Sequence, residues 1–162
     1  YTTGPYPLSY NGWGDVLVIV FFGFVPVGGT YYVQALTWTP DVTIASLVCG
    51  LIIDTLLVVN NYRDREADAR SGKRTVIVRF GEKFGRYFYL SLGIAASLLC
   101  LYFLLEGRIY AAFLPQLYLI PHVLTWRRMV KIHSGKKLNS ILGETSRNML
   151  LMGILLSIGL IS

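Results

Sequence analysis

The densest run of polar side chains in this sequence is residues 60–75, which read NNYRDREADARSGKRT. Asp64 and Asp68 are four residues apart, so on a helix their carboxylates share one face. Mg²⁺ in proteins is usually held by one or two carboxylates together with the phosphates of a substrate. The spacing therefore predicts a magnesium site that acts on a phosphate-containing ligand. A salt-bridged helix end exposed to solvent gives the same pattern, and this alternative stays open.

Five neighbouring side chains could bind a diphosphate, two through amide groups and three through positive charge. The amides of Asn60 and Asn61 can donate to phosphate oxygens or add an oxygen ligand to the metal. The guanidinium groups of Arg63 and Arg74 bind phosphate as planar forks, whereas Lys73 binds it as a point charge. We expect these residues to contact or orient a diphosphate.

Three other site patterns do not fit this stretch. A Walker A loop whose second glycine is Gly72 would need a glycine where Ala67 stands. An EF-hand loop needs acids or amides at alternate positions, and Arg65 and Ala67 interrupt that alternation. The two cysteines and two histidines have no zinc-binding spacing.

The elements that must position these residues are apolar. Of the 162 residues, 54% are hydrophobic and 15% charged, and the mean hydropathy is +0.52. A soluble domain has about 25% charged residues, so this composition excludes a disordered chain and argues against an ordinary soluble domain. The net charge is +6, but 13 of the 15 lysines and arginines lie in two gaps between apolar runs. Cations so placed indicate an integral membrane protein and no nucleic-acid partner.

Five segments are apolar enough to cross a bilayer core about 30 Å thick, which needs about 20 helical residues. They are residues 16–36, 42–59, 87–105, 109–126 and 148–161, and the last can extend back to residue 141. The chain is therefore predicted to be an all-α, polytopic membrane helical bundle. Residues 1–162 are expected to form a single domain.

Charge in the connections predicts the orientation. Residues 63–86 carry eight lysines and arginines and residues 127–137 carry five, whereas residues 1–15 and 37–41 carry none and residues 106–108 carry one. By the positive-inside rule, the two basic connections face the cytoplasm. We therefore expect a multi-pass protein of the inner (plasma) membrane with its polar site on the cytoplasmic side.

Two separated motifs resemble the UbiA superfamily of intramembrane aromatic prenyltransferases. The pattern NNxRDxxxDxxxGKxT at residues 60–75, followed by VRxG at residues 78–81, is similar to the second aspartate-rich motif of that superfamily. The Asn-Asn and Arg-Asp form resembles its MenA branch, which prenylates 1,4-dihydroxy-2-naphthoate in menaquinone synthesis. The opening YTxGPxPLxYxGxG, with FFG at residues 21–23 and GTYYVQ at residues 29–34, is similar to the same branch.

The resemblance implies nine transmembrane helices around a central cavity, of which this chain corresponds to the C-terminal five. A first aspartate-rich motif would then lie in missing N-terminal helices, which become expected partners of this chain within the membrane lipid. The implied reaction moves a polyprenyl group from polyprenyl diphosphate to 1,4-dihydroxy-2-naphthoate with loss of CO₂ and diphosphate. By matching the motif, Asp64 and Asp68 would be the catalytic Mg²⁺ ligands, and the chain alone is expected to be inactive.

Three residues are assigned to the substrate cavity. Tyr1 and Thr2 match a Tyr-Ser/Thr pair near the cavity of the superfamily. Asp54 lies ten residues before Asp64, about 15 Å along a helix, at an angle close to that of Asp68. An acid at this depth costs about 2.5–3.5 kcal/mol on insertion scales. We expect it to lie near the acceptor or to pair with a donor on another helix, with a purely structural hydrogen bond as the equal alternative.

Two other functions stay open. A prenyltransferase of the same superfamily that acts on another aromatic acceptor, such as 4-hydroxybenzoate, would carry the same aspartates. A non-catalytic membrane module whose basic loop binds anionic lipid would carry the same charges. Mg²⁺-dependent binding of a prenyl diphosphate separates the enzyme from the module.

The charge distribution predicts the topology in cells. Tags at residues 70 and 134 are expected to react only with reagents in the cytoplasm, and tags at residues 39 and 107 only with impermeant reagents outside. The reason is the excess of cations, thirteen against one, on the predicted cytoplasmic connections. Labelling of residue 70 from outside intact cells would contradict this orientation.

Overall fold

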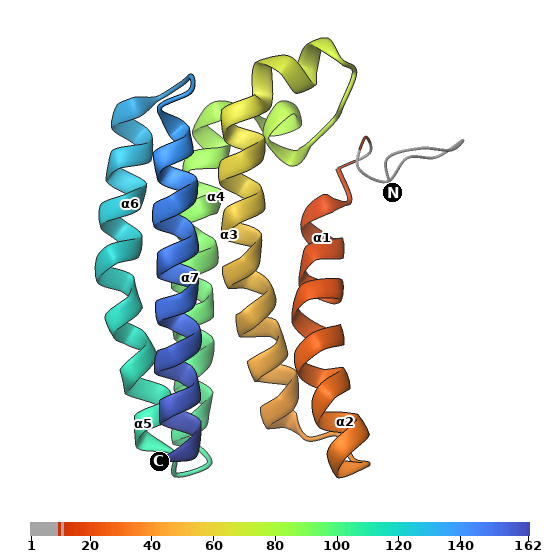
Figure 1. The fold of residues 1–162 in the computed structure, drawn as a ribbon, viewed down its shortest axis with the longest axis vertical. Helices are drawn as coiled ribbons and strands as arrows, with labels where there is room; N and C mark the ends of the chain where they lie inside the picture. Colours follow the sequence, from red (N-terminus) through yellow and green to blue (C-terminus); the bar gives the residue numbers. More distant parts are fainter. Residues whose placement is uncertain (1–9, 11) are drawn as a thin grey trace.

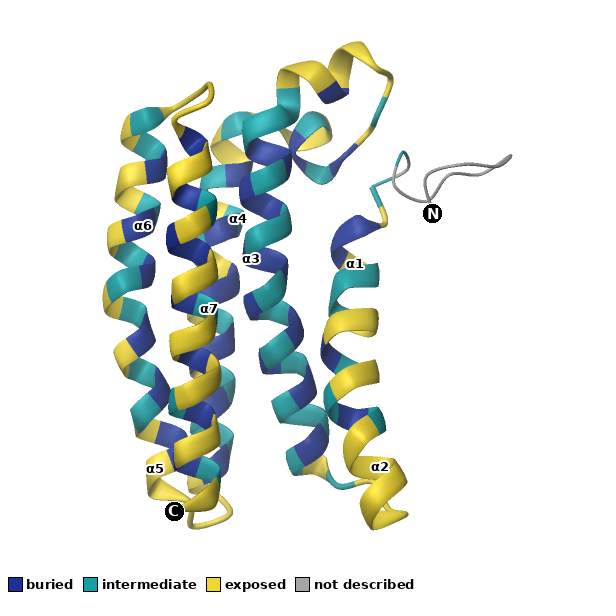
Figure 2. Ribbon diagram, viewed as in Figure 1, coloured by how far each residue is buried: buried dark blue, intermediate teal, exposed yellow. Residues whose placement is uncertain are grey.

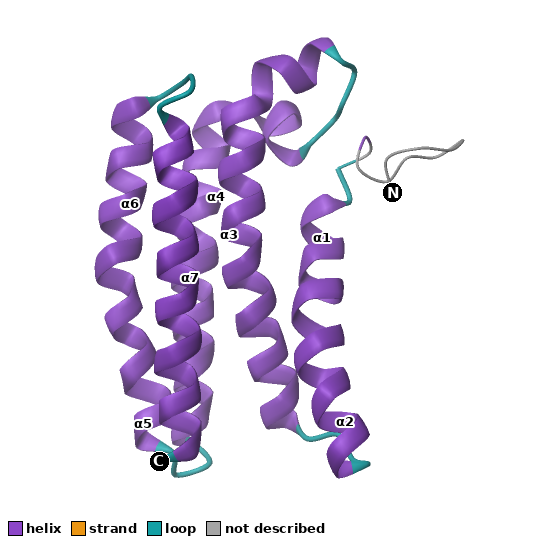
Figure 3. Ribbon diagram, viewed as in Figure 1, coloured by secondary structure: helices purple, strands orange, loops and turns teal. Residues whose placement is uncertain are grey.

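The chain forms a bundle of antiparallel helices, with no strand in the part that the structure describes (Figure 3). A computed structural model describes residue 10 and residues 12–162, so Tyr1 and Thr2 lie outside the described residues. Four helices in this part are long and apolar enough to cross a membrane, namely Gly14–Ala35, Pro40–Arg70, Val76–Leu104 and Leu138–Ile161. The predicted all-α membrane bundle is therefore confirmed.

The first two spans are joined by a short turn at one end of the bundle. The first is a continuous helix in three parts: α1 (Gly14–Val18), the π-helical stretch η2 (Ile19–Gly29) and α2 (Thr30–Ala35). The second is α3 (Pro40–Arg70). Thr39 caps α3, because its side-chain oxygen accepts from the backbone N–H of Val42 at 3.4 Å. Pro40 fits the first helical position, where no backbone donor is needed.

The later spans complete the bundle. α4 (Val76–Cys100) continues into η3 (Leu101–Leu104), and α7 (Leu138–Ile161) is the last helix. Between them, the predicted segment 109–126 is helical but interrupted, and consists of α5 (Ile109–Phe113), η4 (Leu114–Tyr118) and α6 (Leu119–Ile132). Pro115 and Pro121 lie near the starts of η4 and α6, where they remove backbone donors from a continuous helix.

The basic connections lie together at one end of the bundle. In Figure 1 the α3–α4 and α6–α7 connections share the end at which α1 begins, and the α2–α3 and α4–α5 connections share the opposite end. The first two carry the two clusters of lysine and arginine. This is the arrangement that the positive-inside rule requires of a single cationic face.

Glycines set the contact between the first span and α3. A Cβ atom at Gly23 would lie 2.4 Å from the carbonyl oxygen of Ser46, and one at Gly50 would lie 2.9 Å from the Cα of Ile19. The helices are antiparallel, so residue 23 pairs with residue 46 as residue 19 pairs with residue 50. Small residues let membrane helices pack backbone to backbone in this way. We call this contact the glycine seam; the opposite face of the span is largely exposed (Figure 2).

A buried histidine fixes the contact between α4 and α6. The ring of His122 lies so close to Gly93 that a Cβ there would be 2.2 Å from Nε2. Its Nδ1 shares a hydrogen bond of 2.8 Å with the hydroxyl of Tyr118, and its ring stacks on Tyr89 with centroids 4.6 Å apart. His122 is therefore part of the packed interior of the bundle.

Replacing Gly23 with alanine is expected to destabilise the protein by about 1–3 kcal/mol, the usual cost of overfilling a packed contact. The atom that the new Cβ meets is a backbone carbonyl, which has no flexible end to move away. Gly29→Ala in the same span is the matched control, because nothing lies within 4 Å of the Cβ it adds. Thermal unfolding of the whole protein in detergent measures the difference, and equal midpoints for the two variants would refute the seam.

Candidate functional site

The polar motif lies where α3 ends and the chain reverses. The backbone N–H of Lys73 donates to the carbonyl of Asp68 at 3.0 Å, and the N–H of Gly72 donates to the carbonyl of Ala69 at 3.2 Å. These two bonds form a Schellman motif, in which Gly72 takes a φ of +78° without steric cost. The reversal brings Lys73 back beside Asp68.

Both motif aspartates are held by basic neighbours. Arg63 donates to Asp64 through two bonds, from Nε to Oδ1 at 2.7 Å and from Nη2 to Oδ2 at 2.6 Å. Lys73 Nζ donates to Asp68 Oδ1 at 2.9 Å. The hydrogen bond to Asp68 raises the pKa of Lys73, so the ammonium stays charged. The predicted carboxylates and two of the predicted phosphate-binding cations are thus brought together at one turn.

Arg63 also links the motif to another helix. Its Nη2 donates to the amide oxygen of Asn60 at 2.8 Å, and its Nη1 donates to the amide oxygen of Asn139 at 3.0 Å. Asn139 lies in the first turn of α7, 76 positions along the chain. A lone asparagine so far from the motif gives no local signal, and sequence reasoning missed it.

Tyr10 and Gly12 contact the reversal after α3. The backbone N–H of Arg74 donates to the carbonyl of Tyr10 at 2.9 Å, and Lys73 Nζ lies 5.9 Å from the centre of the Tyr10 ring. A Cβ at Gly12, where φ is +79°, would lie 2.8 Å from the carbonyl oxygen of Arg74. The side chain of Arg74 is exposed, whereas Asn61 is buried. Tyr10 and Gly12 therefore meet the end of the aspartate motif at this turn.

A polar cluster beside the motif joins three parts of the bundle. Glu82 accepts hydrogen bonds from the hydroxyl of Tyr62 at 3.0 Å and from Arg65 at 3.4 Å, and it pairs with Arg86. His133 Nδ1 lies 3.0 Å from Glu82, and Arg65 donates to the carbonyl of His133 at 3.2 Å. The cluster holds the end of α3 against α4 and the α6–α7 connection. Sequence reasoning assigned no role to these residues.

Asp54 lies deeper, in the contact between α3 and the first span. It is fully buried, and neither carboxylate oxygen has a hydrogen-bond partner among the described residues. The register of the glycine seam, in which Ile19 meets Gly50, places residue 15 opposite residue 54. Asp15 is buried too. The neighbour that the structure gives Asp54 is therefore an acid, which the sequence pattern did not indicate.

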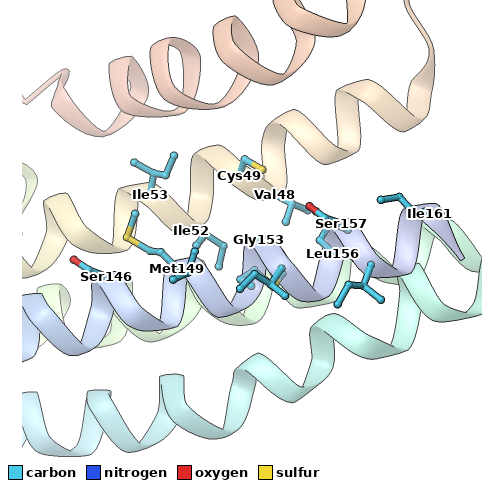
Figure 4. A pocket seen from close by; sticks show the side chains of 14 residues that line it. Val48, Cys49, Ile52, Ile53, Ser146, Met149, Gly153, Leu156, Ser157 and Ile161 are labelled. Carbon is cyan, nitrogen blue, oxygen red and sulfur yellow. The ribbon is translucent and has the colours of Figure 1, made fainter.

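An apolar groove of about 660 Å³ runs between α3 and α7 (Figure 4). Its walls include Ile52 and Ile53 from α3 and Met149 and Leu156 from α7. A long apolar groove at membrane depth suits a hydrocarbon chain.

The donor set at the end of α3 suits Mg²⁺ that arrives with a phosphate ligand. Asp64 and Asp68 supply two carboxylates one helical turn apart, and Asn60 supplies an amide oxygen nearby. No cluster of three or more His, Cys, Asp or Glu side chains occurs in the described part of the chain. Two carboxylates are nevertheless the usual protein share of a magnesium site completed by phosphate oxygens.

Comparison with known proteins connects this site to a family. A family model described as "UbiA prenyltransferase family" matches residues 1–154. The chain is 35% identical to a 1,4-dihydroxy-2-naphthoate octaprenyltransferase of Haemophilus influenzae, over 99% of this chain and 53% of the relative. It is 42% identical to the Escherichia coli protein of the same description, over 62% of this chain and 32% of the relative.

A more distant relative differs in its prenyl group. A 2-carboxy-1,4-naphthoquinone phytyltransferase of Synechocystis is 28% identical over 52% of this chain and 28% of the relative. No solved structure matches the chain significantly. The chain spans about half the length of the Haemophilus relative.

Proposed function

This chain belongs to the UbiA prenyltransferase family, and we propose that it is part of an enzyme that transfers a polyprenyl group from its diphosphate to 1,4-dihydroxy-2-naphthoate in menaquinone synthesis. The observation that carries the proposal is the turn at the end of α3, where two carboxylates and their cationic partners converge. The naphthoate acceptor is supported by the descriptions of the relatives. Octaprenyl and phytyl groups both occur in those descriptions, so the proposal leaves the prenyl length open.

The diphosphate would be bound by the basic side chains that now neutralise the aspartates. Asp64 and Asp68 would hold Mg²⁺, which would supply positive charge to stabilise the departing diphosphate. The guanidinium of Arg63 and the ammonium of Lys73, which now bond to the two aspartates, would donate to phosphate oxygens. Arg74, exposed at the same turn, adds a third cation.

The reaction is a substitution on the aromatic ring. The C–O bond of the prenyl diphosphate breaks, and its electron pair leaves with the diphosphate. An electron pair of the ring then forms a bond to the allylic cation. The ring carboxylate leaves as CO₂, and the electrons of the broken C–C bond restore the aromatic ring. The apolar groove between α3 and α7 would hold the prenyl tail, and the membrane would shield the cation from water.

We place this chemistry at the cytoplasmic face of the plasma membrane, since the motif lies at the end of the bundle with the basic connections. The two aspartates of this chain would supply only part of the ligands of a metal bound to a diphosphate. A second set of acidic ligands would come from other helices of the whole protein, packed beside the groove between α3 and α7.

Asp64→Asn and Asp68→Asn are each expected to lower turnover about 100-fold or more, the usual loss when a group that stabilises transition-state charge is removed. Glu66→Gln is the matched control, because Glu66 is an exposed acid in the same turn of α3. The assay is diphosphate release by the whole protein with a prenyl diphosphate, 1,4-dihydroxy-2-naphthoate and Mg²⁺. Near-normal rates for both aspartate variants would disprove the metal assignment, and so would an equal loss in Glu66→Gln.

We also propose that Asp54 faces the acceptor end of the cavity. Asp54→Leu is then expected to lower kcat/KM for the naphthoate about tenfold or more without lowering the unfolding temperature, because a buried acid with no partner contributes no stability. Asp15→Leu is the comparison variant, because it removes the other buried acid, and it should lower kcat/KM less than Asp54→Leu. A wild-type-like Asp54→Leu enzyme would refute the proposed role at the acceptor. A variant that loses stability and keeps its kinetics would leave Asp54 a structural role only.

A further inference from the structure

Three arginines gather in a second groove, between α6 and α7. Arg127 and Arg128 come from α6 and Arg147 comes from α7, and the groove has a volume of about 420 Å³. The two helices lie side by side in Figure 1. No residue of α3 lines this groove, so it is separate from the aspartate site.

The charges in the groove are unbalanced. Arg128 pairs with Glu144 at 2.6 Å, and this glutamate is the one acid that lines the groove. Neither Arg127 nor Arg147 forms an ion pair with any of the carboxylates that the structure describes. The guanidinium groups of Arg127 and Arg147 could therefore bind an anion from outside the chain.

Buried hydrogen bonds hold the floor of the groove. Asn148 donates to the hydroxyl of Thr125 at 2.9 Å, and Thr125 donates to Glu144 Oε2 at 3.4 Å. All three side chains are at least nine-tenths buried. The carboxylate of Glu144 is thus held in place, and Arg128 with it, so part of the charge around the groove is fixed before any ligand arrives.

The distance of the arginines from the ends of their helices indicates which kind of anion they bind. Arg147 is nine residues into α7, about 13 Å from the start of the helix, and Arg127 is five residues before the end of α6, about 7 Å from it. A cation at such depth on an exposed helix face is costly unless it reaches the interface or an anion. Leu124, which is 53% exposed, lines the same groove and adds apolar surface that suits an acyl chain.

We propose that the groove between α6 and α7 binds the headgroup of an anionic phospholipid in the leaflet at the basic end of the bundle. Arg127 and Arg147 would each donate to the phosphate through a planar guanidinium fork. One acyl chain would lie along Pro121 and Leu124, which form the apolar part of the lining. Basic pockets between membrane helices commonly take such headgroups.

The test counts lipids that stay bound to the whole protein. The protein is purified with phosphatidylglycerol or with phosphatidylcholine, and retained lipid is measured by native mass spectrometry and by titration. We expect phosphatidylglycerol to be retained preferentially. The double variant Arg127→Gln/Arg147→Gln should bind it about thirtyfold more weakly, since each of the two cations near the surface contributes about 1 kcal/mol. Lys136→Gln/Lys137→Gln, which removes two exposed cations at the same end but outside the groove, should bind it normally.

A second measurement does not depend on the stability of the variants. A photoreactive phosphatidylglycerol should crosslink the wild-type protein within residues 121–128 or 144–148, and Arg127→Lys/Arg147→Lys should retain part of the binding because it keeps the charge. Equal retention of phosphatidylcholine would overturn the proposal. So would crosslinks confined to other segments, equal weakening by the two double variants, or stoichiometric displacement of the lipid by a prenyl diphosphate.

Discussion

The close approach of two helix backbones along the glycine seam is the constraint on which the site depends. Gly23 and Gly50 allow the first span to lie directly on α3, where any side chain would meet backbone atoms. That contact fixes the register of the two helices, and the register determines what lies further along them. It places Asp15 opposite Asp54, and it brings Tyr10 and Gly12 to the turn after α3. Tyr10 and Gly12 reach the aspartate motif in the register that these glycines allow.

The same turn explains how acids and bases can crowd together before a ligand binds. Each motif aspartate is neutralised by a basic neighbour, Asp64 by Arg63 and Asp68 by Lys73. A metal and a diphosphate would give each of these groups a new partner of opposite charge. Such an exchange avoids leaving bare carboxylates at a membrane boundary, where unpaired charges are costly. In our proposal, structural ion pairs and substrate-binding groups are therefore the same residues at different stages.

α7 serves two grooves of opposite chemistry. Toward α3 it presents Met149 and Leu156, and that groove is almost entirely apolar. Toward α6 it presents Glu144 and Arg147, and that groove is strongly cationic. One helix can do both because side chains three or four residues apart share a face, while intermediate positions point elsewhere. The apolar groove suits a prenyl tail, and the cationic groove suits the headgroup of a surrounding lipid.

The sequence by itself determined the membrane bundle, the segregation of its charges and the aspartate motif, because hydropathy, charge and i, i+4 spacing are local properties. It did not show that Asn139 reaches Arg63, that Glu82 binds Tyr62 and two arginines, or that Asp54 lies opposite another acid. Those contacts join positions far apart in the chain, and only helix packing decides them. The sequence therefore predicted the kinds of chemical group in each segment, whereas the register between helices decided which groups contact one another.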